Sequence, residues 1–69
     1  MKRVAFVCTG EELVIGDIED TNSTFFAQQF VKNDIHPGQR VIVGDDETEI
    51  ENAIRYLQPL HQTIITIGG

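Results

Sequence analysis

The sequence has 69 residues, enough for one small domain, and its 41% hydrophobic and 23% charged residues indicate a folding chain rather than a disordered one. Its formal net charge is −6, and because the five basic residues are scattered along the chain, nucleic-acid binding is not expected. No apolar stretch approaches the roughly 20 residues of a membrane span, no secretory signal is apparent, and a single cysteine, Cys8, forms no internal disulfide, so we expect a soluble, cytoplasmic protein.

The first predicted element is a strand over residues 4–8, where a continuous apolar run indicates burial on both faces, as in a parallel sheet. Residues 10–20 follow with two glycines and five acidic side chains, a composition typical of a loop. Cys8 lies inside the apolar run and is interpreted as a small core hydrophobe.

A helix is predicted next, capped by Asp20 or Thr21 and ending at Asn33 and Asp34, since Asn tolerates the left-handed backbone found just past helix ends. Its apolar stripe at helical spacing is predicted to face the core and comprises Phe25, Phe26, Ala27, Phe30 and Val31.

A second strand is predicted over residues 35–43, with Pro37 and Gly38 confined to its start and Gly44 breaking it. The following helix has the clearest signal in the chain. Asp46 as N-cap and Glu49 three residues later form a capping-box-like pair, and Pro59 stops the helix. Its apolar positions fall at i, i+3, i+4 and i+7, namely Ile50, Ala53, Ile54 and Leu57. A third buried strand is predicted over residues 62–67, ending in Gly68 and Gly69.

The resulting order, β-α-β-α-β, predicts an α/β fold with a three-layer parallel sheet and right-handed crossovers. Two helices are few to cover both faces of the sheet, and the sheet keeps exposed edges. We therefore interpret residues 1–69 as part of a larger domain, or as a chain that completes its sheet by forming a homo-oligomer. A complete miniature flavodoxin-like fold is the alternative.

Parallel strands place their carboxyl ends at one edge of the sheet, where open α/β folds bind ligands. Glycine and acidic residues follow each strand there, and Gly68 with Gly69 is the best candidate to let backbone N–H groups approach a phosphate. Mg²⁺ could be held between the phosphate and the carboxylates of Glu11, Glu12, Asp45 and Asp46.

Each of these residues also has a structural interpretation. Asp45 and Asp46 are ordinary helix caps, Glu11 and Glu12 fit a solvated loop, and a bare Gly-Gly pair fits a turn. Asn22, in the first helical turn, either contacts a ligand or hydrogen-bonds its own backbone. His36 and His61 start strands at the opposite edge, where neither a catalytic nor a metal-binding role is expected.

Three segments resemble one known family, the molybdopterin-binding-type domain of CinA-family competence/damage-inducible proteins. Residues 10–22, GEELVIGDIEDTN, resemble the family's opening motif GxELLxGxIxDTN. Residues 43–46, VGDD, resemble its VGDD/VGDN segment, and residues 64–69, IITIGG, resemble the start of its ITTGGLGPTxDD motif. Order and spacing agree over nearly the whole chain.

The resemblance implies the N-terminal portion of a MogA/MoaB-like fold, shared with MoeA/gephyrin domains that bind molybdopterin and in some cases adenylylate it with Mg-ATP. It also implies hydrolysis of ADP-ribose to AMP and ribose 5-phosphate. Asp45 matches the acid after the second strand of the active site, Glu11 matches the acid of the first motif, and Gly68 and Gly69 begin the phosphate- or pterin-binding turn.

Some family features are missing or changed. The Leu-Gly-Pro-Thr stretch and its following aspartates, which supply much of the family site, are not in this sequence, and Ile67 stands where the family usually has Thr or Ser. Asn33 and Asp34 replace the usual Leu-Gly or Glu-Gly helix end. Half of an active site is therefore present, and little activity is expected of this chain alone.

Three functional hypotheses follow. The first is a metal-assisted phosphoanhydride hydrolase or nucleotidyl-transfer domain, with Asp45 as the catalytic residue, ligand contacts from Gly10, Glu11, Asn22, Gly44, Gly68 and Gly69, and Mg²⁺ on Glu11, Asp45 and Asp46. The second is a pterin- or nucleotide-binding module without turnover. The third is an inactive remnant of a molybdenum-cofactor protein.

Overall fold

The computed structural model describes residues 3–68 and contains three strands and three helices. In chain order they are β1 (Arg3–Thr9), α1 (Glu11–Val14), α2 (Thr21–Lys32), β2 (His36–Val43), α3 (Glu47–Leu57) and β3 (Thr63–Gly68). No helix in the described part is long and apolar enough to cross a membrane.

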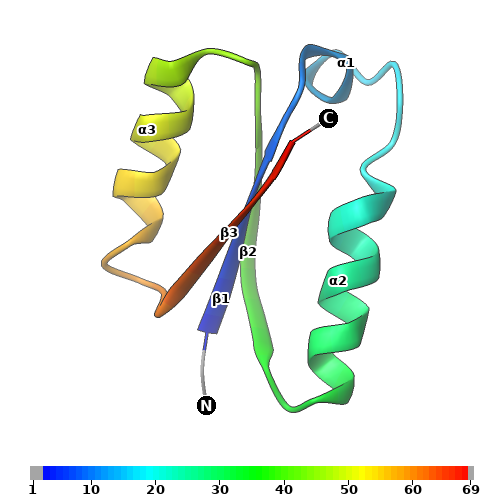
Figure 1. The fold of residues 1–69 in the computed structure, drawn as a ribbon, viewed down its shortest axis with the longest axis vertical. Coiled ribbons are helices and arrows are strands. Elements are labelled where there is room, and N and C mark those ends of the chain that lie inside the picture. Colours follow the sequence, from blue (N-terminus) through cyan, green and yellow to red (C-terminus); the bar gives the residue numbers. More distant parts are fainter. Residues whose placement is uncertain (1–2, 69) are drawn as a thin grey trace.

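The strands form one parallel sheet in the order β2-β1-β3, with α2 on one face and α3 on the other (Figure 1). The chain moves outward from β1 to β2 and then back across β1 to β3. Right-handed crossovers in these two opposite directions place their helices on opposite faces of the sheet. The predicted three-layer α/β fold is therefore confirmed.

The central strand β1 supplies most of the core, which explains its unbroken apolar run. Successive side chains of a strand point to opposite faces, so Ala5 and Val7 pack with Ala53 and Leu57 of α3. Val4, Phe6 and Cys8 face α2, where the rings of Phe6 and Phe30 stack with their centroids 5.8 Å apart.

The start of β2 contains a bulge. Val4 pairs with Pro37 and Ala5 with Gln39, so Gly38 is the extra residue. A side chain at position 38 would collide with the imidazole of His61, which is buried and hydrogen-bonded through Nδ1 to the carbonyl of Leu57 at 3.1 Å. Pro37 and Gly38 do occupy the strand start, as predicted.

The apolar stripe predicted for α2 is wrong in part. Ala27 and Phe30 pack on the sheet, whereas Phe25, Phe26 and Val31 are 56%, 42% and 61% exposed. The inward face is set by Ser23, which is fully buried. At about 100° per residue, Phe25 falls on the far side of the helix from that face, and Phe26 and Val31 fall on its flanks.

Two further expectations need correction. Residues 10–20 contain the short helix α1 rather than loop alone. At the end of α2 the left-handed residue is Asp34, with φ of 59°, while the Asn33 side chain donates to the carbonyl of Gln29 at 2.8 Å.

The predicted N-caps are present. Asp20 accepts a hydrogen bond from the N–H of Ser23 at 3.1 Å, and Asp46 accepts one from the N–H of Thr48 at 3.0 Å. The partner of Asp46 is thus Thr48 and not Glu49, so the capping-box interpretation of that pair was wrong. The Glu49 carboxylate instead reaches toward Gly44.

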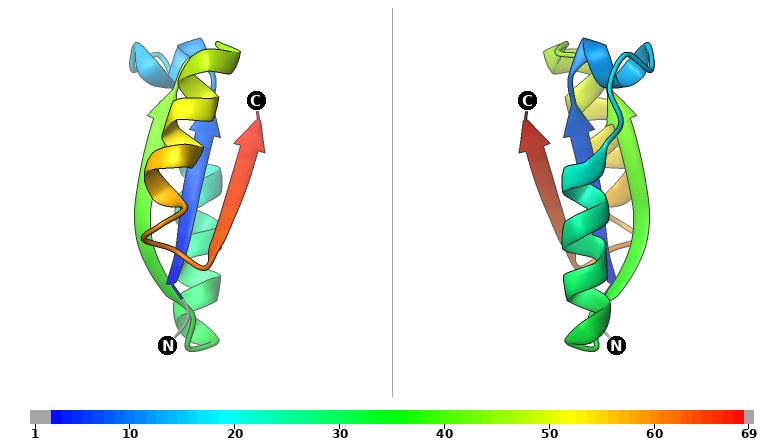
Figure 2. Two further views of the ribbon diagram at one scale, coloured as in Figure 1. Left: turned by 90° about the vertical axis from the view of Figure 1, so that its left-hand side faces the viewer. Right: turned by 90° about the vertical axis from the view of Figure 1, so that its right-hand side faces the viewer.

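The edge strand β3 receives less cover than its neighbours. Figure 2 shows α2 and α3 lying over β1 and β2, with β3 away from them on one side. Its three isoleucines, Ile64, Ile65 and Ile67, are consequently only half-buried.

Candidate functional site

All three strands end at the same edge of the sheet, at Thr9, Val43 and Gly68. The short helix α1 lies at this edge directly after β1, and the N–H of Gly10 ties it to the carbonyl of Val43 at 3.0 Å. The predicted clustering of the post-strand segments is therefore observed, but the segments line two separate hollows.

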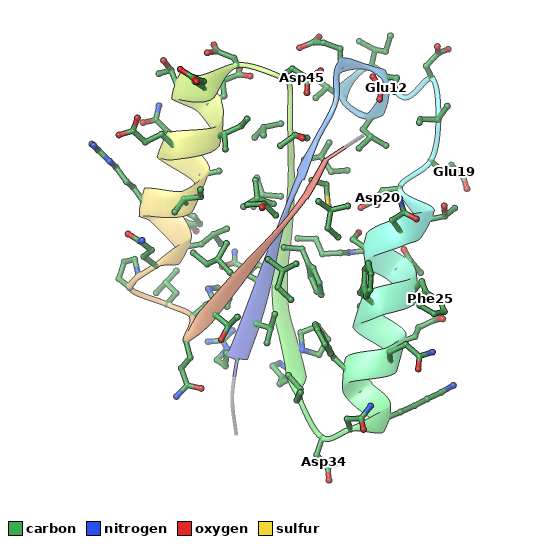
Figure 3. The ribbon with its side chains drawn as sticks, in the orientation of Figure 1. Glu12, Glu19, Asp20, Phe25, Asp34 and Asp45 are labelled. Carbon is green, nitrogen blue, oxygen red and sulfur yellow. The ribbon has the colours of Figure 1, made fainter. Side chains whose placement is uncertain are left out.

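The first hollow, of about 120 Å³, lies between the ends of β1 and β3, α1 and the start of α2. It brings Asn22 and Gly68 together, as expected for ligand-binding residues that meet at this edge. Its polar lining comes from Thr9, Glu12, Glu19, Asp20, Thr21 and Asn22, and its apolar lining from Cys8, Leu13, Ile18 and Ile67. Figure 3 shows Glu12, Glu19 and Asp20 on the α2 side of the sheet edge.

The second hollow, of about 680 Å³, is broader and lies on the α3 side beside β2. It brings Glu11 and Gly44 together and adds Glu49. A side chain at Gly44 would collide with the Glu11 carboxylate and would lie 3.3 Å from Oε2 of Glu49. Two carboxylates therefore converge above the bare backbone of Gly44.

The helical turn of α1 explains why neighbouring acids enter different hollows. Successive side chains on a helix point about 100° apart, so Glu11 turns toward β2 and Glu12 toward α2. An interpretation of residues 10–20 as a loop could not separate these two acids.

Three further predicted site residues, Gly10, Asp45 and Asp46, lie at the same edge without lining either hollow. Asp45 and Asp46 are exposed at the start of α3, and one oxygen of Asp46 is engaged as the N-cap. Gly10 has φ of 152°, a conformation that favours glycine. Gly69 lies outside the described residues. Within residues 3–68 no three His, Cys, Asp or Glu side chains form a ready-made metal site.

Sequence reasoning did not predict that two polar residues would line the first hollow. Glu19 and Asp20 were assigned to solvation and capping, yet both line the hollow with Asn22. Burial by itself raises the pKa of Asp20, but hydrogen bonds from Ser23 and the nearby charge of Arg40 outweigh it and hold the pKa below its usual value. The DTN motif at residues 20–22 was the available signal.

Cys8, at the floor of the same hollow, has its thiol pKa raised, chiefly by burial. This matches the interpretation of Cys8 as a core residue, because a raised pKa disfavours the reactive thiolate. His36 and His61 lie at the opposite edge of the sheet, as expected.

Residues 5–69 match the family model described as a probable molybdopterin binding domain. A CinA-like protein of Geobacter sulfurreducens is 37% identical over 67 residues, covering 97% of this chain and 16% of the relative. A CinA-like protein of Shewanella sp. (strain MR-4) is 38% identical over 71 residues, covering 100% of this chain and 16% of the relative.

A putative competence-damage inducible protein of Pediococcus pentosaceus is 33% identical over 63 residues, covering 91% of this chain and 15% of the relative. The chain thus spans about a sixth of the length of these relatives. No solved structure matches the chain significantly.

Proposed function

Because this chain belongs to the family of probable molybdopterin-binding domains, we propose that the carboxyl edge of its sheet binds the phosphate-bearing end of a pterin or nucleotide together with Mg²⁺. The observation that carries the proposal is the convergence of Asn22, Gly68 and three carboxylates in one hollow at this edge. In open parallel sheets this edge is where ligands bind.

Gly68 has no side chain, so a phosphate can approach its backbone closely. It is exposed at the end of β3, and the position of a side chain there would meet only Thr9 Oγ1, at 3.7 Å. The space beside its backbone is thus open to a ligand. Asn22, exposed in the first turn of α2, offers both a donor and an acceptor to the same ligand.

A cation is proposed because both hollows at this edge are lined by acids and by no Lys or Arg among the described residues. Carboxylates repel a phosphate unless positive charge lies between them. Mg²⁺ is usually held by one or two carboxylates plus substrate phosphates and water, and the oxygens of Glu11 and Glu49 above Gly44 suit that donor set. Asp45 and Asp46, at the same edge, are proposed to complete it.

The finer proposal is hydrolysis of an ADP-ribose-type pyrophosphate. Bound Mg²⁺ would supply polarisation of a phosphoryl oxygen. Asp45 is free of capping hydrogen bonds among the described contacts and exposed beside Gly44, and we assign it the orientation of the attacking water. Binding without turnover is the second candidate, favoured because Glu11 and Asn22 line different hollows. We propose that either function is carried out in the cytoplasm.

Isothermal titration calorimetry with ADP-ribose and with molybdopterin, each with and without Mg²⁺, tests the proposal. We expect saturable binding of at least one ligand that strengthens at least tenfold when Mg²⁺ is added. Glu11→Gln should reduce this Mg²⁺ dependence, and Asn22→Ala should weaken binding in both conditions. Release of AMP from ADP-ribose separates turnover from binding.

The matched control is Asp34→Asn. It removes one carboxylate at the opposite edge of the sheet and suits the left-handed backbone there, where φ is 59°. This variant should bind like the wild type. Absence of binding by both ligands, or equal loss in Asp34→Asn and Asn22→Ala, would contradict a site at the carboxyl edge.

A further inference from the structure

Behind the first hollow, a polar network joins the start of α2 to the middle of β2. Nη1 of Arg40 donates to Thr24 Oγ1 at 2.6 Å and to Ser23 Oγ at 3.3 Å. Thr24 Oγ1 in turn donates to the carbonyl of Asp20 at 3.1 Å, and Ser23 Oγ donates to Asp20 Oδ2. Each hydroxyl donates its single proton to Asp20, so the lone pairs of its oxygen accept the hydrogen bonds from Arg40.

The network ends in the wall of the hollow, but Arg40 does not belong to that wall. Asp20, Thr21 and Asn22 line the hollow, and Ser23 behind them is fully buried. Arg40 sits in β2 opposite Phe6 of β1 and is absent from the lining. Any effect of Arg40 on a ligand is therefore indirect, through the two hydroxyls and through its charge near Asp20.

The chain before α2 is held by local contacts. Ile15 and Ile18, in the connection from α1, are 71% and 54% exposed, and the N–H groups of Asp17 and Ile18 both donate to the carbonyl of Glu12, at 2.8 and 3.2 Å. Since these bonds stay within the connection, hydrogen bonds to the sheet contribute to the position of the first turn of α2. Arg40 supplies two of them from the adjacent strand.

We propose that Arg40 is a positioning residue for the ligand site: through Ser23 and Thr24 its guanidinium holds Asp20 and Asn22 in the geometry that binds ligand. This inference rests on the proposed function, because it assumes that the first hollow is the site. It adds Arg40, a residue outside the lining of the hollow, to the residues that ligand binding requires.

The test compares Arg40→Gln, Arg40→Lys, Ser23→Ala and the double variant Arg40→Gln/Ser23→Ala with the wild type, using Mg²⁺ and ADP-ribose as the probe. Arg40→Gln should weaken binding about tenfold, as expected for lost charge-assisted hydrogen bonds, and Arg40→Lys should restore part of it. Effects of Arg40→Gln and Ser23→Ala should be non-additive, since both break one network. Arg55→Gln, which removes an exposed arginine paired with Glu51 on α3, is the control and should bind normally.

A second measurement decides the inference when no ligand binds. NMR of the free protein should show the Asp20 carboxyl titrating at higher pH in Arg40→Gln than in the wild type, with faster amide exchange at Ser23 and Thr24. Arg40→Lys should return both towards wild type, which a general loss of stability would not do. Failure of the wild type to bind either ADP-ribose or molybdopterin refutes the proposed function, whereas unchanged titration and exchange in Arg40→Gln refute the positioning role.

Discussion

Gly10 meets two constraints that other residue types do not meet together. Its φ of 152° disfavours any side chain, and a Cβ at this position would lie 2.9 Å from Oε1 of Glu12. The glycine thereby lets Glu12 fold back over the end of β1 into the first hollow. Gly68 has no such constraint, since an added Cβ would make an ordinary 3.7 Å contact with Thr9 Oγ1.

Gly10→Ala should therefore destabilise the fold by about 1–3 kcal/mol through backbone strain, while Gly68→Ala should stay within about 0.5 kcal/mol of the wild type. Urea unfolding followed by circular dichroism measures both. Equal losses in the two variants would show that the described turn after β1 is wrong.

Protonation of Asp20 makes the free energy of unfolding depend on pH in the acidic range. Burial raises the pKa of its carboxyl, but hydrogen bonds from Ser23 and the charge of Arg40 outweigh burial and hold the folded-state pKa below the ordinary value of 3.8. A lowered folded pKa contributes stability above the unfolded pKa, and that stability is lost as pH falls through the folded value.

Asp20→Ala should cost about 1 kcal/mol at pH 7, as the loss of a helix N-cap does. This cost should shrink as pH falls below 3.8 and through the lower pKa of the folded state, where the wild-type carboxyl becomes protonated. Asp20→Asn keeps a cap that does not titrate and serves as the control. A cost for Asp20→Ala that is the same at pH 3 and pH 7 would contradict the assigned role of the carboxylate.

At the scale of the elements, sequence reasoning succeeded where one physical demand dominated. The apolar run of β1 indicated burial on both faces, and the i, i+3, i+4, i+7 spacing placed Ala53 and Leu57 of α3 in the core. In α2 the five apolar residues of the predicted stripe do not all fit on the buried face. The buried Ser23 shows that a polar side chain determines which face of the helix packs on the sheet. Apolar spacing alone contains no information about that hydroxyl.

The two helices should accordingly respond differently to truncation. Leu57→Ala removes a fully buried side chain of α3 and should cost about 2–5 kcal/mol. Phe25→Ala removes a larger side chain of α2 that is 56% exposed and should cost less than about 1 kcal/mol. Chemical denaturation gives both values, and a larger loss for Phe25→Ala would mean that α2 is rotated from its described position.

The candidate site was predictable to the level of the sheet edge and no further. Topology brings Glu11, Asn22, Gly44 and Gly68 to one edge, and this followed from the β-α-β-α-β order. The division into two hollows depends on α1, whose four residues are too short for a periodicity signal. The contribution of Glu49 likewise depends on tertiary proximity to Gly44.

For the whole molecule, self-association stays a prediction, and it is based on the edge strand β3. Residues 63–68, TIITIG, carry no charge in a chain of net charge −6, and neither helix covers the strand closely (Figure 2). Uncharged edge strands pair readily with other chains. A second copy is the partner that we predict in a solution of the isolated chain.

Sedimentation velocity over a hundredfold concentration range should show a dimer or larger species that dissociates on dilution. Thr66→Lys places a charge on the exposed part of β3 and should shift the protein to monomer, while Gln58→Lys, exposed at the end of α3, should not. A wild-type chain that stays folded and monomeric at all concentrations would contradict the prediction.

The central claim is that the shared carboxyl edge of the three strands binds ligand, and NMR shift mapping tests it most directly. On titration of the labelled chain with ADP-ribose and Mg²⁺, we expect amide shifts in residues 9–22, in residues 43–46 and at Gly68. Shifts concentrated at the opposite edge, in residues 34–38 and 61–63, would contradict the claim.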